Sequence, residues 1–133
     1  MKSRFVTLSV LAMLVFGVAA YAHHSFAGTY VQDKTITIEG KVAEFNIRNP
    51  HSFISIEVVG KDGKVTRWGC EWAGTTQLSE GGVTRFTLKI GDRIIIDGAP
   101  SRDAAEAKIL VSKVTRAGAD GKPTEQVWQG RVQ

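Results

Sequence analysis

The sequence predicts an all-β domain, a five-stranded OB-like small barrel with one short helix, after an N-terminal signal peptide. Three observations predict it. Apolar and polar residues alternate in five segments separated by turn residues, as in strands with one buried face. The first segment is long and changes phase, as expected of a strand that bends between the two halves of a barrel. A short helical segment falls between the third and fourth strands. An open antiparallel sandwich is the alternative arrangement.

The chain begins with the features of a secretory leader. Lys2 and Arg4 give a positive start, an apolar run covers residues 5–21, and residues 20–22 read Ala-Tyr-Ala, the small-residue pattern of a cleavage site. We expect cleavage after Ala22 and export to the periplasm or the medium. An uncleaved membrane anchor is the alternative, although the run is short, because spanning a bilayer takes roughly 20 apolar residues.

Composition limits what the exported part can be. Residues 23–133 number 111, enough for one small domain with one core. Two of the 17 Lys and Arg residues and none of the 13 Asp and Glu residues lie in the leader, so the mature net charge is +2. There is no block of like charges, so nucleic acid is not an expected partner. Cys70 is the only cysteine and can form no internal disulfide.

The first strand is expected to bend. Apolar residues alternate with polar ones over residues 36–42 and continue over 45–47 in the opposite phase. The phase changes near Ala43, shortly after Gly40, which indicates a bulge or a sharp bend. Such a strand can pair in both halves of a small barrel and remove its exposed edges.

A hairpin is expected to supply the second and third strands, over residues 52–59 and 65–72. The turn between them contains Asp-Gly, a strong hairpin signal. In the third strand Cys70 alternates with two tryptophans on one face, and a free cysteine is usually buried. We therefore interpret Cys70 as a core residue, with a ligand role as the alternative. We interpret Trp68 and Trp72 as core or barrel-mouth packing, and the charged Arg48, Arg67 and Glu71 as solvated strand faces.

The remaining elements follow in order. A short helix is expected within residues 74–82, begun by a threonine cap and ended by glycines. A fourth strand lies within residues 88–100 and a fifth covers 108–116. The end of the chain has few apolar residues and is expected to be loose or packed only through Trp128. The chain thus divides into a leader (1–22), a histidine-containing arm (23–34), the barrel (35–117) and a tail (118–133).

Four segments carry a resemblance to a known family: HHSFAGTY, EGKVAEFNIRNPHSFISIEV, DGKVTRWGCEW and TLKIGDRIIIDGAPSRD. Over about residues 23–122 the chain resembles the small exported bacterial proteins catalogued as domain of unknown function 6152. The family pattern usually has no cysteine in the third strand, so Cys70 departs from it. The resemblance implies an exported single-domain protein and supplies no activity.

The three histidines suggest a metal site. After cleavage His23 offers its α-amino nitrogen and its ring, which titrate at about 7.7–8.0 and about 6.5 and therefore both ligate near neutral pH. His24 adds a ring or a backbone nitrogen, and His51 closes the site if its loop folds toward the N-terminus. Three or four nitrogen donors suit Cu(II), which the divalent affinity order also favours. Zinc would accept the same rings in a tetrahedral site.

Other interpretations stay open. The histidine pair can equally be a solvated arm, and His51 can simply occupy a turn. The first functional hypothesis is a small periplasmic protein that binds copper through His23, His24 and His51. The second is an OB-type interaction module that binds a peptide, a glycan or a partner protein through residues 48–52 and the barrel face. The third is a small copper oxidant. No catalytic triad or phosphate-loop motif is present, which favours a binding protein over an enzyme.

Overall fold

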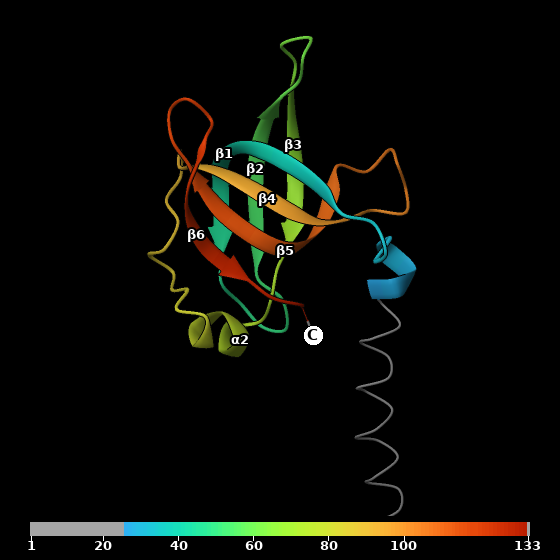
Figure 1. Cartoon of the computed structure of the whole chain (residues 1–133). Helices are drawn as coiled ribbons and strands as arrows, with labels where there is room; N and C mark the ends of the chain where they lie inside the picture. The colour runs from blue at the N-terminus through green and yellow to red at the C-terminus, as the bar shows by residue number, and fades with distance from the viewer. Residues whose placement is uncertain (1–25, 133) are drawn as a thin grey trace, which may run out of the picture.

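Six strands and two short helical segments form the part of the chain that the structure describes, residues 26–132 of a computed structural model (Figure 1). The first helical segment covers residues 26–29. The predicted leader (1–22) and the candidate ligands His23 and His24 lie outside the described residues. The named elements are β1 (Ile36–Asn46), β2 (Phe53–Val59), β3 (Val65–Glu71), α2 (Thr75–Glu80), β4 (Arg93–Pro100), β5 (Lys108–Ala117) and β6 (Pro123–Gln129).

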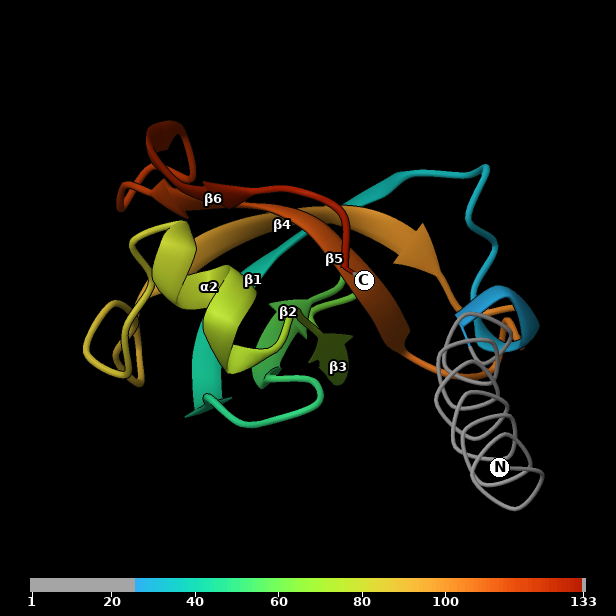
Figure 2. The same cartoon turned by 90° about the horizontal axis from the view of Figure 1, so that it is seen from below.

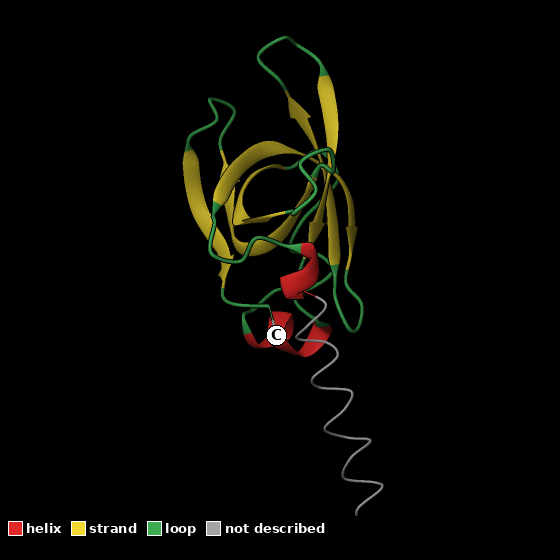
Figure 3. Ribbon diagram, turned by 90° about the vertical axis from the view of Figure 1, so that its right-hand side faces the viewer, coloured by secondary structure: helices red, strands yellow, loops and turns green. Residues whose placement is uncertain are grey.

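Five of the strands close into a barrel. The sheet order is β3-β2-β1-β4-β5-β6, and a parallel pairing of β3 with β5 joins the two ends of the five-stranded part. Figure 3 shows the strands curving around a common interior. The order of pairing, with α2 between β3 and β4, is the OB-like arrangement. The predicted barrel is therefore confirmed, with β6 as an additional strand, and the open sandwich does not form.

Strand β1 bends where the change of phase predicts it. Its first half, Ile36–Lys41, pairs with β4, and its second half, Lys41–Asn46, pairs with β2. The register with β2 shifts between Val42 and Glu44, which marks a bulge. Gly40 precedes it, and a Cβ at this position would overlap the carbonyl oxygen of Glu57. The glycine thus permits the close approach of two backbones that closure of the barrel requires.

Helix α2 lies at one end of the barrel (Figures 1 and 2) and buries Leu78 completely. The predicted threonine cap is wrong, because the N-cap is Gly74 and makes no side-chain hydrogen bond. The side chain of Asn49, from the β1–β2 loop, serves the helix instead. Its Oδ1 accepts hydrogen bonds from the backbone nitrogen of Thr75 at 3.0 Å and from the Thr75 hydroxyl at 2.8 Å. The loop that carries His51 is therefore tied to α2.

The expectation of a loose end after Gly118 is wrong over β6. Strand β3 pairs with the first residues of β5, and β6 pairs with later residues of β5. The two strands therefore cover different parts of the same β5 edge. Trp128 is buried as expected, with its ring at 81° to Trp72 and 5.6 Å from it. Polar residues occupy most of β6, and for this reason the alternation that reveals the other strands is absent here.

The core confirms the interpretation of Cys70. Its side chain is fully buried on β3, and burial raises the pKa of the thiol to about 12. Trp72 is also fully buried, and Trp68 packs partly buried against the same core. Within residues 26–132 no helix is long and apolar enough to span a membrane.

Candidate functional site

The segment that follows the histidine pair is packed on the barrel. Phe26 and Tyr30 are buried, 5% and 2% exposed, and share a small cluster with Leu110 of β5. Backbone hydrogen bonds fix the same segment along the β4–β5 connection, which the blue and orange ribbons of Figure 1 show side by side. They join Val31 N to Pro100 O at 2.9 Å and Arg102 N to Thr29 O at 2.9 Å, and the Arg102 guanidinium donates to Ala27 O at 2.7 Å.

His51 lies on the β1–β2 loop and is held in place from several directions. The next residue, Ser52, exchanges backbone hydrogen bonds with Trp72 and Ala73, at 2.8 and 3.0 Å. The Arg48 side chain donates to the carbonyl oxygen of His51 at 3.3 Å. The ring of His51 packs against Phe26, with centroids 4.6 Å apart and planes at 56°. The loop that carries His51 therefore contacts the N-terminal segment at Phe26.

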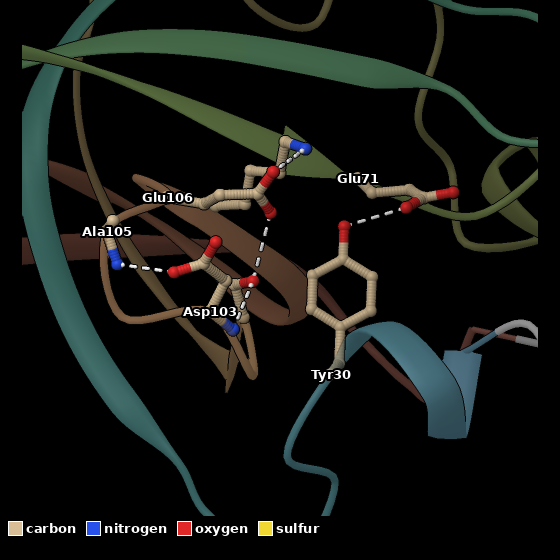
Figure 4. Close-up of polar contacts among 7 residues, drawn as sticks. Tyr30, Glu71, Asp103, Ala105 and Glu106 are labelled. Carbon is tan, nitrogen blue, oxygen red and sulfur yellow. Dashed lines mark hydrogen bonds and ion pairs between the residues drawn. The ribbon is translucent and has the colours of Figure 1, made fainter.

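Glu71, the last residue of β3, connects His51 to Tyr30. One carboxylate oxygen lies 3.1 Å from Nδ1 of His51, and the other accepts a hydrogen bond from the Tyr30 hydroxyl at 2.7 Å. Figure 4 shows the hydroxyl pointing at the carboxylate. Glu71 is thus more than the solvated strand residue we expected: its side chain is 32% exposed, but both of its oxygens have partners. We name Tyr30, Glu71 and His51 the carboxylate cluster.

The surroundings keep Tyr30 as a neutral donor. Burial, and after it the hydrogen bond to Glu71, raises the pKa of the Tyr30 phenol well above its ordinary value. A second carboxylate, Glu106, adds to this electrostatically and has its own partners, Lys108 at 2.9 Å and Ser101 at 3.1 Å (Figure 4). The hydrogen bond from Lys108 is the main reason that the pKa of Glu106 is lowered.

The structure places only one of the three candidate ligands, since His23 and His24 lie outside the described residues. The His51 side chain is 22% exposed, and within residues 26–132 its Nε2 makes no hydrogen bond. Over the same residues no three His, Cys, Asp or Glu side chains are grouped to hold a metal ion. In the sequence His24 precedes Phe26 by two residues and His23 precedes it by three.

A separate hollow lies on another part of the barrel. A groove of about 540 Å³ runs beside β1 and the β2–β3 hairpin, and Gly40, Glu57 and Arg93 contribute to its walls. Val59 and Val65, which face each other at the tip of the hairpin, are 67% and 60% exposed. His51, the one predicted ligand in the described part of the chain, does not line this groove.

One protein-family model matches the chain, over residues 11–109, and its description is "Family of unknown function (DUF6152)". The matched residues include all three histidines, Tyr30 and Glu71, and they end within β5. No curated protein matches the chain.

Proposed function

The chain belongs to the DUF6152 family of unknown function, and we propose that its mature form is an exported protein that binds a metal ion, most readily Cu(II), through His23, His24 and His51. The contact between the rings of Phe26 and His51 carries this proposal. It brings the loop histidine to the segment that begins two residues after His24 in the sequence. Cleavage after Ala22 supplies the last element, a free amine on His23.

The donor set suits copper. A free N-terminal histidine holds a metal with its α-amino nitrogen and its ring, and the two form one chelate. His24 contributes a ring or a backbone nitrogen, and Nε2 of His51 supplies a further imidazole. Nitrogen donors in a tetragonal arrangement are typical of Cu(II) sites, and Cu(II) stands above Zn(II) in the divalent affinity order. The buried Cys70 thiol has no part in this site, because its side chain is fully enclosed in the core.

A titration of three forms tests the proposal. The parent is exported with its leader, and mass spectrometry establishes that it begins at His23. A second form carries one extra glycine between Ala22 and His23, which turns the His23 amine into an amide and breaks the chelate. The third form is His51→Ala. We expect each change to weaken Cu(II) binding at least about tenfold, which corresponds to about 1.4 kcal/mol.

The outcomes separate the hypotheses. If His51→Ala binds copper like the parent, the metal sits on the arm alone and the proposed site is wrong. If all three forms bind equally weakly, the interaction module becomes the better hypothesis, and the groove beside β1 is the surface to examine. Oxygen- or peroxide-dependent turnover by the copper-loaded parent would favour the copper oxidant instead. The extended form can recruit the next backbone nitrogen, so His51→Ala is the more decisive variant.

A further inference from the structure

We propose that Glu71 is the positioning residue of His51: its carboxylate, held on the other side by Tyr30, fixes the ring with its proton on Nδ1 and leaves the lone pair of Nε2 as the metal-binding atom. The choice of ligand atom rests on the proposed function. The position of the ring proton does not, and it can be measured without metal.

The geometry of the carboxylate cluster leads to this assignment. A carboxylate only accepts hydrogen bonds, so the 3.1 Å contact from Glu71 requires the proton of a neutral His51 ring to be on Nδ1. The second oxygen of Glu71 is occupied by the Tyr30 hydroxyl at 2.7 Å, so the carboxylate is held from both sides. Tyr30 is itself buried and fixed through its backbone pairing with Ser101. Rotation of Glu71 away from His51 would therefore break a hydrogen bond to an anchored partner.

The same contacts decide which nitrogen is available. Nδ1 faces Glu71, and the Phe26 ring packs against the imidazole. Nε2 is the one ring nitrogen of His51 without a partner in the described part of the chain. A histidine whose other nitrogen donates to a carboxylate is a better metal ligand, because the hydrogen bond fixes its tautomer and raises its basicity. If the contact between Glu71 and His51 were only structural, the loss of Glu71 would not change metal binding at Nε2, and this can be tested.

The first measurement uses nitrogen-15 NMR on the metal-free protein beginning at His23, at a pH of about 8, where an ordinary imidazole is neutral. Protonated and unprotonated ring nitrogens have well-separated shifts, and the signals of His51 are those missing from His51→Gln. The parent should show the proton on Nδ1. In Glu71→Ala the other tautomer should become populated. In Glu71→Gln the amide oxygen can still accept from Nδ1, so the parent tautomer should return.

The second measurement is Cu(II) affinity in the same variants. Glu71→Ala should bind about 10–100-fold more weakly than the parent, the usual effect of losing such a partner, and Glu71→Gln should recover part of the loss. Glu106→Ala is the matched control, because this carboxylate also acts electrostatically on Tyr30 but bonds to Ser101 and Lys108. It should change neither the tautomer nor the affinity. Unchanged backbone amide spectra of the strands establish that each variant is folded.

The two measurements fail separately. The inference is overturned if the metal-free parent carries its proton on Nε2, or if Glu71→Ala keeps it on Nδ1. It is also overturned if the parent binds copper and Glu71→Ala binds it equally well, a result that leaves the proposed function standing. If the tautomer responds as expected but the parent binds no copper, the proposed function is wrong, and Glu71 is supported as the residue that positions the ring.

Discussion

At the scale of single residues, Tyr30 offers a direct test of the carboxylate cluster. In the protein that begins at His23 it is the only tyrosine, so near-ultraviolet phenolate absorbance reports it alone. Burial and the Glu71 hydrogen bond raise its pKa, so we expect it to ionise well above pH about 10, the ordinary value. Titration near the ordinary value would contradict the hydrogen bond to Glu71.

The same shift has a consequence for stability. Because the folded-state pKa of Tyr30 is raised, its contribution to the unfolding free energy is fully present below pH about 10 and is lost as the pH rises further. Tyr30→Phe should therefore flatten the alkaline loss of stability, measured by denaturant unfolding at several pH values. An equally steep loss in parent and variant would assign the alkaline sensitivity to other groups.

Cys70 gives a second prediction at this scale. The thiol is fully buried, and burial raises its pKa to about 12. In the folded protein a reagent therefore cannot reach the sulfur easily, and little of the reactive thiolate is present. A thiol reagent should label it slowly under native conditions and rapidly in denaturant. Rapid native labelling would mean that the β3 core opens readily, and it would revive a ligand role for this cysteine.

At the scale of elements, the bend of β1 depends on Gly40. A side chain at this position would overlap the carbonyl oxygen of Glu57, so Gly40→Val must force β1 and β2 apart. We expect a loss of at least about 2 kcal/mol in unfolding free energy, far outside the range of about 0.5 kcal/mol for neutral surface changes. Gly28→Ala is the control, because a Cβ there meets no atom of residues 26–132 within 4 Å. A loss for Gly40→Val as small as that of the control would contradict the close approach.

The elements also show why sequence reasoning found the barrel and missed part of the site. The phase change near Ala43 and the Asp-Gly turn are local signals in the sequence. The first marks the bulge in the pairing of β1 with β2, and the second marks the β2–β3 hairpin. The contact of Tyr30 with Glu71 joins residues 41 positions apart. It exists only because closure of the barrel brings the end of β3 to the start of β5, where the N-terminal segment packs. Glu71 therefore reads as an ordinary charged strand residue until the topology is known.

At the scale of the whole molecule, the proposed site has one part on the barrel and one part on the arm. His51 is fixed by the β1–β2 loop, by α2 through Asn49 and by β3 through Glu71. His23 and His24 are adjacent in the sequence, so an unfolded chain still presents both to a metal ion. His51 joins the other ligands only when the barrel is folded. Metal binding that includes His51 therefore stabilises the folded state.

Copper should therefore stabilise the folded parent and not the variant that lacks the loop ligand. A ligand that binds only the folded state stabilises it by about 2.7 kcal/mol at a free concentration 100 times its dissociation constant. We expect a clear copper-dependent rise in the melting temperature of the parent, followed by circular dichroism. His51→Ala should show little or no rise even at copper concentrations that saturate its arm, because the remaining ligands bind equally well after unfolding. An equal rise in melting temperature in both proteins would show that copper stabilises the fold without binding His51. That result would contradict the proposed site whatever the copper affinities of the two proteins are.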